Sequence, residues 1–180
     1  MQRIKCASIL SILVSASVTI ALADSVGEAL AKAKAGSCKT TTAALVARIT
    51  EAVVEEFEKA WRVSGCGIAE VEGAVLLYRM ADGSISARSQ GQTNQRRKFT
   101  MVCDPGVIAI VHTHPNKCNA QPEGGDLEIA NRLRIPVFTI TNRGMYVYDP
   151  GTRKMSKVQD GLNWLDPAKW MPGENLATRQ

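Results

Sequence analysis

The sequence predicts a single α/β domain, because the period of its hydrophobic residues changes along the chain. Apolar residues recur every four positions across residues 41–62, which is typical of an amphipathic helix. After residue 68 the pattern changes to short runs rich in β-branched residues, separated by turn sequences, which indicates strands. The 180-residue chain, even without its N-terminal apolar segment, is long enough for one domain with its own core.

Residues 1–23 have the pattern of a secretory signal peptide. A basic start with Arg3 and Lys5 precedes an apolar stretch, and Ala21-Leu22-Ala23 forms a small-x-small cleavage sequence before Asp24. The apolar stretch is interrupted by Ser and Thr and is short for a bilayer span, which argues against a stable membrane anchor. We therefore expect an exported protein, periplasmic or secreted by a bacterium.

The charge of the chain gives little support to a nucleic-acid partner. The full sequence has 22 Lys and Arg against 17 Asp and Glu, for a formal net charge of +5. Removal of Arg3 and Lys5 lowers this excess to about +3, and residues 96–98 hold much of what remains. A nucleic-acid interface would need a wider basic face with aromatic residues. We interpret the basic triplet as a solvated loop.

Four cysteines follow the predicted cleavage site, at positions 38, 66, 103 and 118. An even number in an oxidising compartment predicts two disulfides. A Cys38–Cys66 bond is disfavoured, because the helix predicted between them spans about 30 Å and a disulfide needs Cα atoms about 5.5 Å apart. No C-x-x-C spacing supports zinc ligation by cysteine.

The expected elements follow in order. Residues 24–40 are an Ala- and Gly-rich leader or linker, and residues 41–62 form one long helix with Thr40, Thr41 or Thr42 as N-cap and Ser64-Gly65 as its end. The apolar stripe of this helix is formed by Leu45, Ile49, Val53, Phe57 and Trp61.

Strands and one further helix make up the rest of the domain, which we place at residues 41–155. Strands are expected at residues 68–78, near residue 85, and at 99–103, 107–112, 136–141 and 145–148, with a helix at 126–134. Residues 156–180 are expected to form an irregular tail that wraps the domain.

Both histidines of the chain lie in one tetrapeptide, His112-Thr113-His114-Pro115, at the end of a β-branched run. Alternate residues of a strand point to the same face, so the two imidazoles lie side by side. Asp126 follows at the predicted start of a helix. Two imidazoles and a carboxylate are a three-ligand set that leaves one zinc position open, as in catalytic zinc sites. The alternatives are neighbouring histidines without a metal, and Asp126 as a helix N-cap.

These residues resemble the metal motif of the JAMM/MPN-domain zinc proteases, which have a glutamate on an early strand, then His-Ser/Thr-His-Pro and Ser-x-x-Asp. The resemblance covers roughly residues 41–150. It implies a single domain with a curved mixed sheet, packed by the long N-terminal helix and by the helix after the His-x-His strand. It also implies one Zn²⁺ ion and hydrolysis of peptide or isopeptide bonds. The same scaffold occurs as metal-free binding modules.

The family's catalytic glutamate has two candidates, Glu70 and Glu72, which we expect on one face of one strand. Glu72 is favoured because Gly73-Ala74 and an apolar run follow it, as in the family. Glu70 remains the alternative because some members show its Glu-x-x-Gly spacing. An exposed strand face would explain either carboxylate without any catalytic role.

One position departs from the family. Glu123 stands where the family has a serine that stabilises the oxyanion, and the loop from His114 to Asp126 is one residue longer than usual. An ionised carboxylate cannot donate a hydrogen bond, and loss of one such donor typically costs about 10²–10³ in rate. Asn119, or a backbone amide at residue 124 or 125, is a candidate substitute.

The sequence therefore predicts an exported zinc-dependent metallohydrolase that cleaves an amide bond in a protein or peptide. His112, His114 and Asp126 would hold the zinc ion, and Glu72 would act as general base. Peptidoglycan peptides are candidate substrates by location alone. The alternative is a catalytically silent periplasmic binding or envelope-assembly module on the same fold, with or without zinc.

Overall fold

A computed structural model describes residues 9–12, 41–92, 98–101 and 103–179. The predicted leader at residues 24–40, and Cys38 within it, lie outside the described residues. The described chain forms a mixed six-stranded sheet with helices on both faces, which confirms the predicted α/β class. In sheet order, the strands are β3 (Ile85–Gln92), β2 (Gly73–Arg79), β5 (Val107–Thr113), β6 (Val137–Thr141), β7 (Gly144–Asp149) and β8 (Lys154–Asp160).

Strand β5 lies inside the sheet, between β2 and β6. Its pairing with β2 is antiparallel and its pairing with β6 is parallel. Helix α4 (Gly125–Leu133) lies on the crossover connection that parallel pairing requires. All other neighbouring strands of this sheet pair in antiparallel fashion. The connection after β5 therefore carries the chain from the end of β5 to α4 and back to β6.

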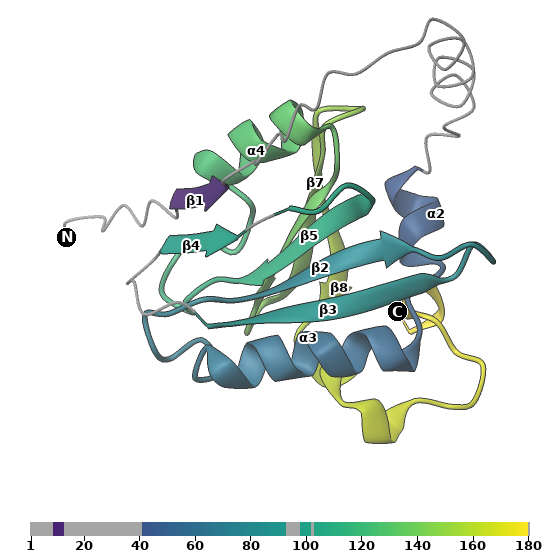
Figure 1. Ribbon diagram of the computed structural model, residues 1–180. Coiled ribbons are helices and arrows are strands. Elements are labelled where there is room, and N and C mark those ends of the chain that lie inside the picture. Colours follow the sequence, from purple (N-terminus) through teal and green to yellow (C-terminus); the bar gives the residue numbers. More distant parts are fainter. Residues whose placement is uncertain (1–8, 13–40, 93–97, 102, 180) are drawn as a thin grey trace, which may run out of the picture.

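Two apolar clusters cover the two faces of the sheet (Figure 1). Helix α3 (Glu51–Val63) packs on one face with Ala109 and Val111 of β5, and α4 packs on the other with Ile110. This alternation is the period of two that an extended strand imposes. Since His112 has the same parity as Ile110, it belongs to the α4 face of β5. The buried residues of α3 are Val53, Val54, Phe57, Ala60 and Trp61.

The prediction of one long N-terminal helix is wrong, because two helices occupy this segment. They are α2 (Thr42–Val46), for which Thr41 is the N-cap, and α3. Between them the Ile49 carbonyl accepts a hydrogen bond from the backbone N–H of Leu176 at 2.9 Å, and Thr50 forms an isolated bridge with Asn175. The backbone of the distant C-terminal segment thus replaces the helical hydrogen bonds at this point.

The C-terminal segment is more ordered than expected. The predicted domain limit at residue 155 falls inside β8, which pairs with β7 as the last strand of the sheet. Three short 3₁₀ helices follow, η1 (Asn163–Leu165), η2 (Pro167–Lys169) and η3 (Leu176–Thr178). The segment contributes Trp164, Leu165, Trp170 and Leu176 to the buried cluster on the α3 face. It is therefore part of the domain core.

The strand expected from residue 68 begins later, at Gly73. Ile68 lies in a turn and is 81 % exposed, and residues 70–72 precede β2. Gly65, Cys66 and Gly67 all adopt positive φ, which extends the turn that follows α3. Glu70 and Glu72 therefore do not share one face of a strand, as the sequence had suggested.

Part of the predicted signal peptide is paired in the structure. Residues Ile9–Ile12 form β1, which pairs in parallel with β4 (Lys98–Met101) beside α4 (Figure 1). These two strands form a separate two-stranded sheet. Export remains a prediction from the sequence pattern. None of the helices in the described part of the chain is long and apolar enough to cross a membrane.

The prediction of two disulfides among the four cysteines is wrong. Cys66 and Cys103 are free, and Cys118 is disulfide-bonded. Cys66 is exposed in the turn after α3, whereas Cys103 packs against the apolar cluster beneath α4. The fold thus keeps these two thiols in different surroundings. The expected absence of a Cys38–Cys66 bond agrees with the free thiol of Cys66.

Leu176 provides a test of the role of the C-terminal segment. Its side chain is fully buried, so Leu176→Ala should lower the free energy of unfolding by about 2–5 kcal/mol, measured by urea denaturation. Met171→Ala is the matched control, because Met171 lies in the same segment but is 67 % exposed. It should change stability by less than about 0.5 kcal/mol. Equal effects of the two substitutions would show that the segment is not part of the core.

Candidate metal centre

The two histidines lie at the C-terminal end of β5, in the middle of the sheet. His112 is paired with Ala74 of β2 on one side and with Thr139 of β6 on the other. Both imidazoles are buried, and their ring centroids are 4.8 Å apart. The sequence spacing of two thus brings both rings to one place, as predicted.

Asp126 reaches the same place from the first turn of α4. The N-cap of α4 is Gly124, so the interpretation of Asp126 as a simple N-cap is wrong. The fully buried carboxylate has Oδ1 3.5 Å from Nε2 of His112 and Oδ2 3.4 Å from Nε2 of His114. The partial positive charge at the helix N-terminus favours a carboxylate in this position.

His112, His114 and Asp126 form a group that can hold a metal ion, and one ligand atom from each lies within 4.8 Å of the others. Among the described residues, Nε2 of both histidines and Oδ1 of Asp126 have no hydrogen-bond partner although all three atoms are buried. An unsatisfied buried polar atom typically costs about 1–3 kcal/mol. Three such atoms facing one another are the pattern that a bound cation explains.

The electrostatics of the group favour the metal-binding forms of His112 and Asp126. Burial lowers the pKa of His112. Burial also acts to lower the pKa of His114, but the Asp126 carboxylate outweighs it, and the pKa of His114 is raised. For Asp126, burial acts to raise the pKa, but the two histidines outweigh it and lower the pKa. Asp126 is therefore ionised and His112 neutral, which are the forms that bind a metal ion.

A backbone carbonyl fixes the orientation of His114. Its Nδ1 atom lies 2.7 Å from the carbonyl oxygen of Asn119. Because a carbonyl can only accept, Nδ1 carries a proton and donates it, and in the neutral imidazole the lone pair is therefore on Nε2, which faces Asp126. A hydrogen bond of this kind to the second ring nitrogen is usual for metal-binding histidines.

The two candidate glutamates have different surroundings. Glu72, immediately before β2, is buried, and its Oε2 lies 4.0 Å from Nδ1 of His112. Glu70 instead forms an ion pair with Lys117. The structure thus brings Glu72, and not Glu70, next to the predicted metal ligands.

Glu123 and Asn119 are joined to each other beside the site. The side-chain amide of Asn119 donates to Oε2 of Glu123 at 2.9 Å. The backbone N–H of Glu123 donates to Oδ2 of Asp126 at 3.0 Å. Glu123 therefore orients a predicted ligand through its backbone, while its carboxylate occupies the amide that we had considered as a substitute oxyanion donor.

Three residues support the site through hydrogen bonds that we did not predict from the sequence. The hydroxyl of Thr113 accepts a hydrogen bond from the N–H of Gly73 at 2.9 Å, which ties Glu72 to the histidine strand. Thr139 donates to the carbonyl of Ala120, and Arg143 donates to the carbonyl of Cys118, each at 2.5 Å. Only Thr113 carries a sequence signal, its place between the histidines. The other two hold the connection between β5 and α4 from β6 and from the β6–β7 turn, which lie later in the sequence.

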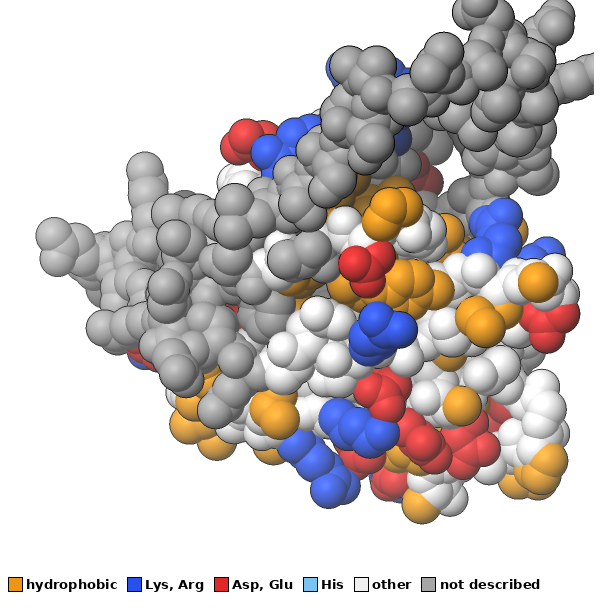
Figure 2. Space-filling model, viewed as in Figure 1, with side chains coloured by type: hydrophobic (Ala, Val, Ile, Leu, Met, Phe, Trp, Pro, Cys, Tyr) orange, Lys and Arg blue, Asp and Glu red, His pale blue; other side chains and the backbone are white. Residues whose placement is uncertain are grey.

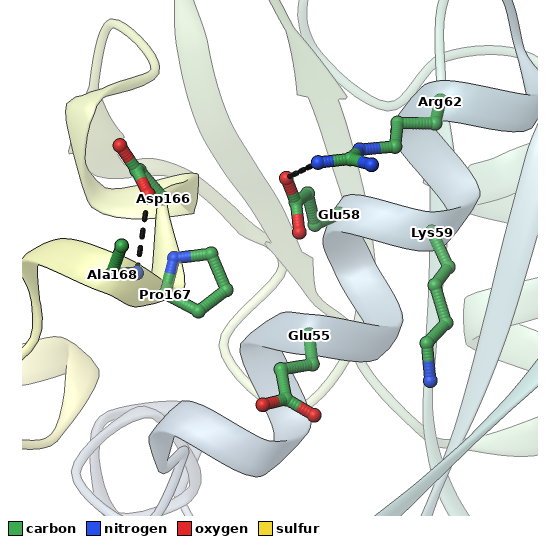
Figure 3. Close-up of a pocket in the computed structure, with 7 residues that line it drawn as sticks. All are labelled: Glu55, Glu58, Lys59, Arg62, Asp166, Pro167 and Ala168. Atoms are coloured by element: carbon green, nitrogen blue, oxygen red, sulfur yellow. Dashed lines mark hydrogen bonds and ion pairs between the residues drawn. The ribbon is translucent and has the colours of Figure 1, made fainter.

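A separate hollow between α3 and η2, of about 370 Å³, carries no comparable chemistry (Figure 3). Two of its charged groups have local partners: Arg62 pairs with Glu58 at 2.6 Å, and Asp166 accepts from the N–H of Ala168 at 3.1 Å. Acidic and basic side chains also lie interleaved over this part of the surface (Figure 2). We assign no function to this hollow.

Comparisons with protein-family models, with curated proteins and with solved structures found no match for this chain. The interpretation of the site therefore depends on its own geometry and chemistry.

Metal analysis tests the assignment of the three ligands. Protein purified without chelator should contain about one metal ion per chain, measured by inductively coupled plasma mass spectrometry. His112→Ala or His114→Ala should remove this metal ion. Asp126→Asn should weaken binding, because a neutral amide replaces the ionised ligand. Glu128→Gln on the exposed side of α4 is the control and should retain the metal. Unchanged metal content in both histidine variants would place the metal elsewhere.

Proposed function

We propose that the protein is a zinc-dependent hydrolase of the JAMM/MPN type that cleaves a peptide or isopeptide bond. The observation that carries this proposal is the convergence of two imidazoles and a carboxylate, all buried, with facing atoms that lack hydrogen-bond partners among the described residues. The imidazole-to-carboxylate separations of 3.5 and 3.4 Å, each to a different oxygen of Asp126, are long for hydrogen bonds.

The ligand types favour zinc over other common metals. Imidazole nitrogens suit zinc, whereas calcium and magnesium prefer oxygen ligands alone. Three protein ligands leave a fourth position for water, as in catalytic sites. When bound, a zinc ion polarises the substrate carbonyl and lowers the pKa of a coordinated water molecule toward about 7.

Glu72 is the group that we assign to proton transfer. It accepts a proton as water attacks the amide carbonyl, and it returns that proton to the nitrogen as the C–N bond breaks. The products are a carboxylic acid and an amine, and the glutamate recovers its starting form. Burial next to His112, and the tie between Gly73 and Thr113, support Glu72 over the ion-paired Glu70 for this role.

The alternative function is a binding or envelope-assembly module without catalytic activity, with or without zinc. The observation that favours it is the pair formed by Asn119 and Glu123. A carboxylate at the position where the family has a serine opposes the negative charge that develops on the carbonyl oxygen. Such a carboxylate would therefore lower catalytic activity without removing a metal ligand.

The partners and location that we propose come from the sequence pattern. An exported protein of this type would act on a protein or peptide, and peptidoglycan peptides are candidates because their amide bonds are present in the bacterial envelope. A nucleic-acid partner and a stable membrane anchor are not part of the proposal.

Substitution of Glu72 tests the assigned base. Glu72→Gln should keep the metal, because the residue is not a proposed ligand, and should lower the rate of hydrolysis by at least about 10²-fold. Glu70→Gln is the matched control and should leave the rate nearly unchanged, because Glu70 pairs with Lys117 outside the ligand set. The rates are measured with metal-loaded protein. A larger loss in Glu70→Gln than in Glu72→Gln would reverse the assignment.

Substitution of Glu123 separates the hydrolase from the binding module. Glu123→Ser supplies a neutral donor, and its rate should exceed that of the control Glu123→Ala by at least about tenfold, since one oxyanion donor is typically worth 10²–10³. Both variants keep the backbone N–H that donates to Asp126. If wild type and Glu123→Ser, both zinc-loaded, stay inert on peptide, isopeptide and muropeptide substrates, the binding module becomes the better proposal.

A further inference from the structure

A second cleft lies at the opposite end of β5 from the histidines. Its volume is about 1300 Å³, and its lining comes from α2, β2, β5, α4 and the β7–β8 turn. Val107 of β5 lines it, whereas His112 lies five residues further along the same strand. This distance is about 16 Å in an extended chain. The cleft is therefore distinct from the metal centre.

The rim of the cleft is basic. Arg79, Arg134 and Arg153 line it, and Asp149 is the only acidic residue among the described residues of the lining. The Asp149 carboxylate is occupied: it accepts from the Thr42 hydroxyl at 2.5 Å and from the N–H of Gly151 at 2.7 Å. Neither Arg134 nor Arg153 forms an ion pair with a described residue. The positive charges of Arg134 and Arg153 are thus not paired with an acidic group of the described residues.

Two of these arginines occupy unfavourable backbone positions. Arg134 (φ 57°) and Arg153 (φ 56°) are left-handed, and Cys66 is the only other described non-glycine residue with positive φ. Glycine or asparagine is the usual residue at such positions, including the end of a helix, where Arg134 lies. The chain therefore has guanidinium groups at two rim positions where local structure alone would favour glycine.

The cleft also has an apolar part and a neutral donor. Leu45, Ile108 and Ile135 line it together with Asn131, whose side-chain oxygen accepts from the Tyr148 hydroxyl at 3.1 Å. The amide N–H groups of Asn131 are then the part of this side chain that suits an acceptor. A volume of about 1300 Å³ exceeds the 300–1,000 Å³ typical of small-molecule sites.

We propose that this cleft is a docking site for an extended acidic peptide segment of a partner protein. Carboxylates of the segment pair with the rim arginines, for which bidentate pairing is favourable, and apolar side chains between them contact Leu45 and Ile108. Charge complementarity and the size of the cleft select this occupant. The site goes beyond the proposed hydrolase function and does not depend on it, because none of the metal ligands or Glu72 contributes to the lining.

A binding measurement with defined probes tests the proposal. The probe is a fluorescein-labelled decapeptide of alternating Glu and Leu, measured with full-length protein by fluorescence anisotropy. The Arg134→Gly/Arg153→Gly variant should bind it at least tenfold more weakly, because two charged partners are lost. Glycine is favourable at both positions, so the variant should fold at least as well as wild type. Arg79→Ala, in regular strand conformation, should also weaken binding.

The matched control removes the same charge from outside the cleft. Arg132→Ala/Lys154→Ala changes two exposed basic residues that do not line it, and should bind the probe within twofold of wild type. Equal weakening in both double variants would reduce the effect to net charge and overturn the proposal. A dissociation constant above about 1 mM for the peptide would also overturn the proposal. Tighter binding of a single-stranded DNA oligonucleotide than of the peptide would overturn it as well. The metal content of the Arg134→Gly/Arg153→Gly variant should equal that of wild type, so the two proposals fail or succeed separately.

Discussion

The candidate metal centre depends on one constraint, the position of the end of β5 between β2 and β6. The register that pairs His112 with Ala74 and with Thr139 brings both imidazoles to the middle of the sheet. A shift of one residue would turn both rings to the face covered by α3, which is filled by apolar side chains. The parallel pairing with β6 also requires a crossover connection, and α4 on that connection brings Asp126 to the histidines. Strand order and ligand set are therefore aspects of one arrangement.

The centre is polar in a place where the rest of the fold is apolar. Glu72, His112, His114 and Asp126 are all almost fully buried, and Ile110 and Ala74 of the same sheet face belong to an apolar cluster. Burial of such groups is unfavourable unless each has a partner. Asn119, Glu123 and Thr113 supply partners through hydrogen bonds to the ligands or to the adjacent backbone, but the atoms that face the centre have none among the described residues. A divalent cation would satisfy these atoms and offset the carboxylate charge in one step.

The sequence predicted the local features well and the long-range ones poorly. His112, His114 and Asp126 could be found because strand period and a helix start place them, and both are properties of short segments. The sequence left Glu70 and Glu72 as alternatives, because it did not predict the extended turn after α3. In the structure Glu72 lies beside His112, whereas Glu70 pairs with Lys117. The break between α2 and α3 could not be predicted, because the hydrogen bond from Leu176 to Ile49 joins residues 127 positions apart. The apolar stripe of residues 45–61 continues through that break, so periodicity alone indicates a single helix.

The connection between β5 and α4 positions two of the three candidate metal ligands. Thr139 of β6 and Arg143 of the β6–β7 turn hold it by hydrogen bonds to the carbonyls of Ala120 and Cys118. The same connection supplies the carbonyl that orients His114 and the N–H that orients Asp126. A substitution at Glu123 that keeps its backbone therefore preserves the ligand geometry while it changes the charge beside the centre. For this reason a metal-binding site built in this way can lose or regain an oxyanion donor without any change in its ligands.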